Sequence, residues 1–137
     1  LDQVVRCMPA TPTIAALMRR LDVLVLPSRY EGFPNVLLEA MASGLPAIAS
    51  PVGDVPAMLE HERSGFLIAP GDVPGLANAL RRVRSMSGDE RRAMGRRARD
   101  VVEERYTLER IADAHLHLYR AALARRRGAA RRVETPA

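Results

Sequence analysis

The chain has 137 residues, enough for one domain with a real core, and its single cysteine, Cys7, excludes a scaffold built on disulfides. No basic-then-apolar segment opens the sequence, and its apolar stretches are broken by Pro, Gly or charge well short of the ~18 residues that a membrane helix needs. We therefore expect a soluble, cytoplasmic protein of a reducing compartment.

The basic residues are concentrated in the second half of the chain. All 21 are Arg: residues 1–80 hold 5 Arg and 8 acids, a net of −3, and residues 81–137 hold 16 Arg and 8 acids, a net of +8, which together give the overall +5. We interpret this excess of Arg as the solvated faces of helices, combined with a coding bias towards Arg and Ala. The alternative is peripheral contact with anionic lipid at the inner face of a membrane. Nucleic acid is not an expected partner, because the few aromatic residues are not interleaved with the Arg residues.

Short strands and helices alternate in the first half of the chain. The sequence predicts a strand at Gln3–Cys7, a helix at Thr11–Arg20 and a strand at Leu21–Leu26. A further helix begins at Pro34, a residue type that suits a helix start, and Gly44 closes it in a left-handed conformation. This alternation indicates an α/β fold with a Rossmann-like parallel sheet flanked by helices.

The second half is mostly helical. Strands at Pro46–Ser50 and Gly65–Ala69 flank a short helix, Val55–Glu60, which Asp54 is expected to cap. Three helices follow, each with a capping residue at its start: Val73–Ser85 after Asp72, a helix to about Arg105 with a capping box of Ser87 and Glu90, and a last helix after Thr107. We expect a domain over residues 1–124 and, because apolar patterning ends there, a disordered basic tail over residues 125–137.

The loop and helix that follow Leu26 have the features of an anion site. The helix N-terminus opens at the carboxyl end of a strand, where ligands bind in α/β sheets, and its free N–H groups and dipole favour negative charge. Because Pro34 has no N–H, we expect Asn35, Val36 and Leu37 to supply backbone donors.

Two acidic residues bracket this helix start. Glu39 lies five positions after Pro34, about 7.5 Å along the axis, and its apolar neighbours predict a mostly buried helix on which a carboxylate needs a partner. A nucleotide-sugar fits this layout, with ribose hydroxyls on Glu39, phosphates on the amides and sugar hydroxyls on Glu31. The alternative is that Glu39 is a buried carboxylate bonded to a backbone amide.

These residues also resemble a known family. The segments Pro27-Ser28, Glu31-Gly32-Phe33-Pro34, Leu38–Ala42 and Gly44-Leu45-Pro46 are similar to the retaining, group 1 (family 4-like) glycosyltransferases of the GT-B fold, whose Glu-x7-Glu motif matches Glu31 and Glu39. The resemblance runs from about Val4 to Tyr119. It implies the C-terminal, donor-binding half of a GT-B fold, truncated at its N-terminal side.

The resemblance implies a reaction and a site. Glu31 would be the catalytic residue that contacts the donor sugar, the amides after it would hold the diphosphate, and Glu39 would hold the ribose. The implied transfer of a hexose-type sugar proceeds with retention and uses neither a metal nor a cofactor. A glycan, lipid or small-molecule acceptor would be bound by an N-terminal domain that this sequence lacks. The candidate donor-binding residues are Glu31, Gly32, Phe33, Pro34, Asn35, Val36, Leu37 and Glu39.

The sequence lacks other parts that the family uses. It contains no Lys and no upstream loop with the Arg and Lys that neutralise the diphosphate, so we expect the isolated chain to bind donor at most and to transfer no sugar. Two alternatives stay open: a non-catalytic half-domain that docks on a separate glycosyltransferase subunit, and a GT-B-type sugar-nucleotide epimerase, which would need His and carboxylates in its cleft. His115 and His117 lie two apart on one helix, which argues against a metal pair, and Asp22 is interpreted as structural.

Overall fold

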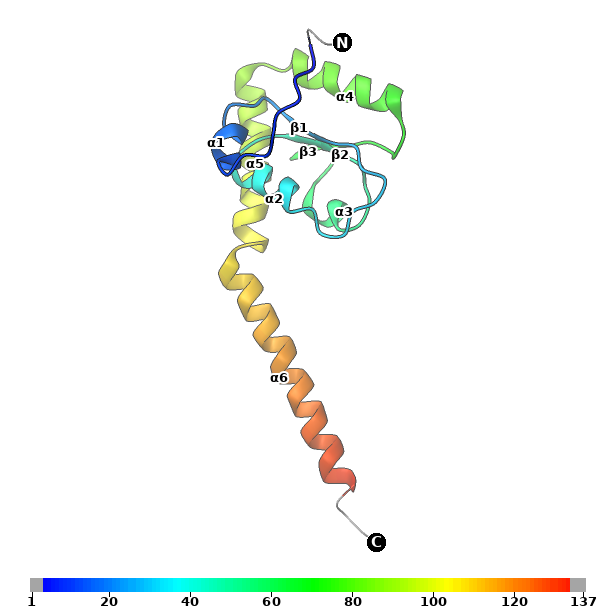
Figure 1. The fold of residues 1–137 in the computed structure, drawn as a ribbon, viewed down its shortest axis with the longest axis vertical. Helices are drawn as coiled ribbons and strands as arrows, with labels where there is room; N and C mark the ends of the chain where they lie inside the picture. The colour runs from blue at the N-terminus through cyan, green and yellow to red at the C-terminus, as the bar shows by residue number, and fades with distance from the viewer. Residues whose placement is uncertain (1–3, 134–137) are drawn as a thin grey trace. The chain divides into compact units, whose positions relative to one another are not determined.

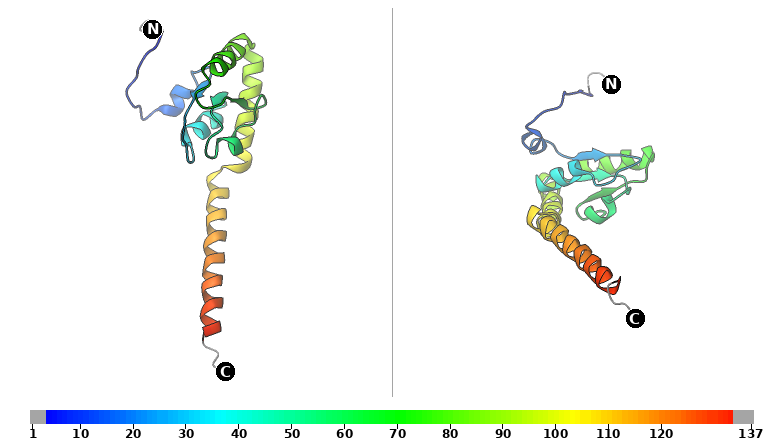
Figure 2. Two further views of the ribbon diagram at one scale, coloured as in Figure 1. Left: turned by 90° about the vertical axis from the view of Figure 1, so that its right-hand side faces the viewer. Right: turned by 60° about the horizontal axis from the view of Figure 1, so that its bottom comes forward.

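The computed structural model describes residues 4–133, which divide between Val102 and Glu103 into two compact units (Figure 1, Figure 2). This division falls earlier than the expected boundary at residue 124, because the apolar side chains of the last helix are exposed rather than packed into a core. The elements are α1 (Ile14–Met18), β1 (Leu24–Leu26), α2 (Asn35–Ala42), β2 (Ala47–Ala49), α3 (Val55–Met58), β3 (Gly65–Leu67), α4 (Val73–Ser85), α5 (Gly88–Arg105) and α6 (Leu108–Val133).

The strands form a parallel sheet in the order β1-β2-β3, with Ile48 of β2 opposite Val25 of β1 and Phe66 of β3. The expected α/β fold with a parallel sheet is therefore confirmed. The predicted strand at Gln3–Cys7 is wrong for its described part, Val4–Cys7, and Gln3 lies outside the described residues. Val4 and Val5 are exposed and pair with no strand, and an extended segment without a hydrogen-bonded neighbour is not part of a sheet.

Helices cover both faces of the sheet, with α2 and α3 on one side and α4 on the other (Figure 1). Ile48 and Phe66 pack with Ala79 and Val83 of α4 and Met94 of α5 in one core cluster. Since side chains alternate along a strand, Ala47 and Ala49 point to the face that α2 contacts. Helix α2 is thus packed on the sheet, with its N-terminus at the carboxyl edge of β1.

The C-terminal end of α2 has the predicted left-handed cap. Gly44 has a φ of +73°, its N–H donates to Met41 O (2.9 Å), and the N–H of Leu45 donates to Ala40 O (3.0 Å). This pair of hydrogen bonds is the Schellman arrangement. Helix α5 lies directly against this turn, so closely that a Cβ added at Gly95 would overlap the carbonyl oxygen of Gly44.

Side-chain caps are confirmed at α4 and α5. Asp72 Oδ1 accepts from Gly75 N (2.8 Å). In the capping box, Ser87 N donates to Glu90 Oε2 (2.6 Å) and Glu90 N donates to Ser87 Oγ (3.2 Å). The backbone N–H of Ser87, and then its hydroxyl, lower the pKa of Glu90 by stabilising the carboxylate. Asp54 lies at the N-cap position of α3, but its side chain makes no capping hydrogen bond.

The second unit begins at Glu103 and contains α6, which is continuous to Val133 (Figure 1). Arg110 N donates to Thr107 Oγ1 (3.4 Å), as expected for a cap at Thr107. The structure differs from the disordered tail expected after residue 124, since residues 125–133 continue the helix, while residues 134–137 lie outside the described residues. The physical reason is composition: Ala and Arg are strong helix formers even where no apolar stripe guides packing.

Gly95→Ala should destabilise the protein even though Ala is the better helix former by about 1 kcal/mol. We expect the added Cβ to push α5 away from the Gly44 carbonyl and to lower the free energy of unfolding by about 1–3 kcal/mol. Urea denaturation measures this. The control is Gly32→Ala, where a Cβ meets nothing within 4 Å. Equal stability of the two variants would contradict the packing described for α5.

Candidate functional site

The candidate site lies where two loops leave the carboxyl edge of the sheet. The first loop joins the end of β1 at Leu26 to the start of α2 at Asn35, and the second follows β2. Ser50 N donates to Leu26 O (3.1 Å), so the two loops start side by side. This is the edge at which ligands bind in parallel α/β sheets, as the sequence predicted.

The second loop fixes the backbone of the first. Asp54 N donates to Gly32 O (3.1 Å). Gly53 has a φ of +54°, and a Cβ on it would overlap the carbonyl oxygen of Glu31. A glycine is therefore required at 53 both by its backbone conformation and by this approach. The position of the Glu31–Gly32 peptide is set by a segment about 20 residues further along the chain.

The N-terminus of α2 presents two free backbone donors. Among the described residues, the N–H groups of Asn35 and Val36 have no hydrogen-bond acceptor. The N–H of Leu37 donates to Pro34 O (3.0 Å), so the expectation that Leu37 also offers a free donor is wrong. This hydrogen bond spans three residues instead of four, which is a common way for the first turn of a helix to satisfy an N–H group. Pro34 itself is buried and occupies the N-cap position.

The two carboxylates differ in their surroundings. Glu31 is half-buried, and its Oε1 accepts a hydrogen bond from Ser28 Oγ (2.7 Å). Glu39 is exposed, and its carboxylate has no partner among residues 4–133. The expectation that Glu39 is a buried carboxylate is therefore wrong, and with it the alternative that it binds a backbone amide. The helix buries only the stripe of Leu37, Ala40 and Met41, because a helix packs on a sheet along one face.

Two serines were not anticipated as members of the site. Ser28 holds the Glu31 carboxylate, and its position three residues earlier in the same loop is the signal that could have indicated it. Ser50, at the end of β2, is buried, and its Oγ has no hydrogen-bond partner in the described structure. No sequence pattern identifies Ser50. Two other predicted residues, Gly32 and Phe33, are both exposed, Phe33 to 46%.

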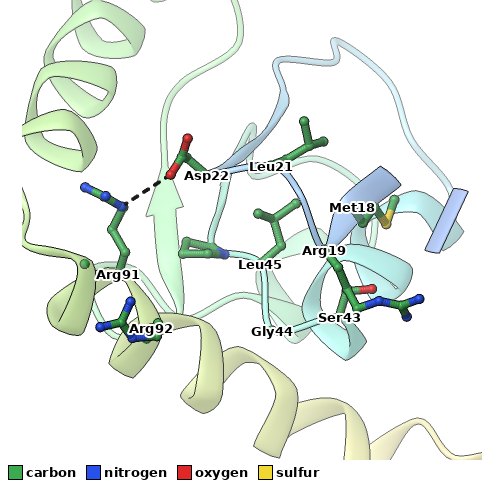
Figure 3. A pocket seen from close by; sticks show the side chains of 11 residues that line it. Met18, Arg19, Leu21, Asp22, Ser43, Gly44, Leu45, Arg91 and Arg92 are labelled. Atoms are coloured by element: carbon green, nitrogen blue, oxygen red, sulfur yellow. Dashed lines mark ion pairs between the residues drawn. The ribbon is translucent and has the colours of Figure 1, made fainter. Parts of the chain in front are cut away.

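A pocket of about 210 Å³ lies elsewhere, at the amino ends of β1 and β2 (Figure 3). It is lined by the end of α1, by the turn after α2 and by Arg91 and Arg92 of α5. Two of its three Arg side chains have acidic partners: Arg91 Nε lies 3.7 Å from Asp22 Oδ1, and Arg92 donates to Asp89 (2.6 Å). Asp22, which the sequence analysis interpreted as structural, lies in this pocket and not in the candidate site, and its side chain is largely exposed. No group of three or more His, Cys, Asp and Glu side chains that could hold a metal is found among the described residues.

Comparisons with known proteins agree on one family. A family model described as "Glycosyl transferases group 1" matches residues 1–85. The chain is 36% identical over 135 residues, 97% of its length, to a D-inositol 3-phosphate glycosyltransferase of Saccharomonospora viridis, but it spans only 31% of that relative. The chain thus corresponds to less than a third of that protein's length.

Solved structures agree with this result. Sucrose-phosphate synthase from Thermosynechococcus elongatus is similar at 37% identity and a TM-score of 0.76, over 81% of this chain and 28% of that one. An Anabaena protein, HepE, solved in complex with UDP is similar at 25% identity and a TM-score of 0.71, over 77% of this chain and 29% of that one.

Gly53→Ala should loosen the loop that carries Glu31. We expect the variant to lose about 1–3 kcal/mol of stability and the amides of residues 28–36 to exchange hydrogen faster. Hydrogen–deuterium exchange measures this. The matched control is Gly71→Ala, because Gly71 also has a positive φ (+79°) but a Cβ there meets nothing within 4 Å. Faster exchange at residues 28–36 in both variants would mean that the contact with Glu31 is not what orders the loop.

Proposed function

The chain belongs to the family of group 1 glycosyl transferases, and we propose that its residues 31–39 bind the nucleotide-diphosphate-sugar donor of such an enzyme. The observation that supports this most directly is the pair of free N–H groups on Asn35 and Val36, at a helix N-terminus beside the Glu31 carboxylate. Free amides and the helix dipole together favour a diphosphate. The Anabaena relative solved with UDP supports a nucleoside diphosphate as the ligand class.

Each part of the site has its own role in this proposal. The Asn35 and Val36 amides bind the diphosphate, and the exposed Glu39 carboxylate accepts hydrogen bonds from the ribose hydroxyls. The carboxylate of Glu31, oriented by Ser28, accepts hydrogen bonds from hydroxyls of the donor sugar. Gly32, Phe33, Pro34 and Leu37 shape the loop rather than donate to phosphate. Charge on the departing diphosphate is then stabilised by fixed N–H dipoles that need no reorganisation.

The chain performs only part of the reaction in this proposal. It spans about 30% of its relatives, so transfer of a hexose with retention, by an enzyme that uses Glu31 as a catalytic residue, is proposed for a longer protein or a complex. These 137 residues by themselves bind donor without transferring sugar in this proposal, because they contain no Lys to neutralise the diphosphate. The exposed, unpaired Cys7 thiol is compatible with a cytoplasmic location.

The position of His61 favours a transferase over a GT-B-type epimerase. An epimerase would need a free His beside carboxylates at the ligand edge. His61 lies before β3, where its Nδ1 accepts a hydrogen bond from Leu67 N (2.9 Å) and its ring meets Phe66 edge-on. An imidazole nitrogen that already accepts from the backbone is not available as a base. His115 and His117 belong to the second unit.

Glu39→Ala should weaken binding of the nucleotide that raises the melting temperature most in a panel of UDP, GDP and ADP. Because the hydrogen bonds are made to a charged group, we expect at least about a tenfold loss of affinity by calorimetry. Asp100→Ala, which removes another exposed carboxylate, is the control. With the 2′,3′-dideoxy nucleotide, Glu39→Ala should have no effect. An equal loss for both nucleotides would refute the ribose contact.

Glu31→Gln should distinguish binding of the donor sugar from binding of the nucleotide. We expect affinity for the nucleotide-sugar to fall while affinity for the nucleoside diphosphate stays unchanged, because the sugar is the only part of the donor that Glu31 contacts. Calorimetry with UDP and UDP-glucose, or the corresponding pair for the preferred base, measures both. If both affinities fall together, Glu31 contacts the diphosphate or orders the loop, and its role with the sugar is wrong.

A further inference from the structure

The outer edge of β3 is closed by a side chain. β3 is the last strand of the described sheet, and successive N–H groups of a strand point to opposite sides. Ile68 N, just after the strand, donates to Ala49 O of β2 (3.0 Å). The N–H of Leu67 therefore points away from β2, and there it donates to Nδ1 of His61 (2.9 Å). An imidazole thus takes the place that the carbonyl of a further strand would have in the ladder.

The backbone of the same turn closes a second outward group of β3. Glu62 N donates to Gly65 O (2.7 Å), and His61 forms an isolated parallel bridge with Gly65. Unpaired N–H and C=O groups at the edge of a sheet are templates for pairing with other chains, and proteins commonly block them. We refer to His61 and Glu62, with their two hydrogen bonds to β3, as the β3 edge seal.

The β3 edge seal requires a backbone conformation that favours glycine. Glu62 has a φ of +63° and is the only residue other than glycine with a positive φ among those described. Such a conformation persists only where the surrounding contacts determine it. Arg82 of α4 makes two of these contacts: its guanidinium donates to Glu62 Oε1 and lies over the ring of Phe66, 4.9 Å from the centroid. The turn is therefore held both from β3 and from α4.

His61 is the member of the β3 edge seal that can change its charge near neutral pH. Nδ1 accepts a hydrogen bond only while it carries no proton. A protonated imidazole has donors at both ring nitrogens, so protonation leaves the N–H of Leu67 without its acceptor. Histidine is the side chain whose charge ordinarily changes between about pH 5 and 8. The hydrogen bond at this edge is thus one that acid removes.

The charged groups around the ring do not replace this acceptor. Glu62 Oε1 lies 3.7 Å from His61 Nε2, and the same oxygen accepts from Arg82. The hydrogen bond from Arg82, and then its charge, lower the pKa of Glu62, so this carboxylate stays ionised while His61 takes up a proton. The other charged side chains of the turn and the Arg of α5 that reaches it are bonded elsewhere: Arg63 to Glu60 (2.7 Å), and Arg97 to Arg63 O (2.6 Å).

We propose that His61 is a proton-sensitive switch at the edge of β3: neutral, it holds the N–H of Leu67, and protonated, it releases this N–H to solvent. The β3 edge seal is complete at high pH and is lost as the pH falls through the titration of His61. All of its hydrogen bonds lie within the described chain, so the switch requires no free surface. It is also independent of the proposed donor site.

Amide hydrogen exchange, resolved by NMR and corrected for the intrinsic rate at each pH, tests the switch. Between about pH 8 and pH 5, the protection factor of Leu67 should fall roughly 2- to 12-fold, as expected for the loss of one hydrogen bond. That of Ile68 should stay constant, because its acceptor, Ala49 O, does not titrate. The midpoint at Leu67 should coincide with the titration of the His61 ring. Equal loss at Leu67 and Ile68, no loss at Leu67, or separate midpoints would overturn the proposal.

Two variants distinguish the acceptor from its titration. His61→Asn offers an amide oxygen near the position of Nδ1 that takes up no proton in this range, so Leu67 should stay protected at both ends of it. His61→Phe keeps an aromatic ring beside Phe66 but has no acceptor, so Leu67 should exchange fast throughout. His117→Asn, which removes another of the three His, should behave as the unchanged protein does.

The protection factor of Ile68 reports whether the sheet is intact in each variant, since its hydrogen bond joins β3 to β2. A pH dependence at Leu67 that survives in His61→Asn would refute the role of His61. So would a pH dependence that disappears in His117→Asn.

Discussion

The site depends on backbone contacts near both ends of α2. Before its N-terminus, the Glu31–Gly32 peptide rests on Gly53, and after its C-terminus the Gly44 carbonyl rests on Gly95. Neither contact leaves room for a Cβ, so α2 and its loop are positioned by main-chain atoms of two other segments, those of Gly53 and Gly95. Main chain is stiffer than side chains, and donors that bind an anion gain affinity from such preorganisation. Two free amides are useful only because these contacts fix where they point.

In the proposed site, the two carboxylates lie before and after the start of α2 and would contact different parts of the ligand. Glu31 sits in the loop, half-buried and oriented by the Ser28 hydroxyl, whereas Glu39 stands on the solvent face of α2 without a partner. A carboxylate that is already hydrated and unpaired loses only water when it binds hydroxyls. The N–H groups between them carry the partial positive charge of the helix end, worth about 0.3–1 kcal/mol per charge at the surface. A ligand that complements the proposed site has a neutral group, the sugar or the ribose, at each acid and an anion between them.

The regions of the chain differ in their charge and in the exposure of their side chains. The carboxyl edge of the sheet carries the acids Glu31 and Glu39, while in the pocket at the amino ends of the strands Asp22 lies beside Arg91. The second unit holds α6, in which residues 114–133 contain six Arg and no Asp or Glu. No helix in the described part of the chain is long and apolar enough to span a bilayer.

The sequence alone determined the order and type of most elements and the helix caps at Gly44, Asp72 and Ser87, because these follow from local rules of backbone conformation. The spacing of Glu31 and Glu39 predicted where the candidate site lies, and that assignment stays a prediction. It did not determine which side of α2 faces solvent, and for that reason Glu39 was expected to be buried. It also did not show that the N–H of Leu37 donates a hydrogen bond to Pro34 O. The contacts of Gly53 and Gly95, and the missing partner for Val4–Cys7, were decided only by tertiary structure. Contacts between segments far apart in the chain leave no periodic trace in a single sequence, since they depend on which faces meet once the sheet has formed.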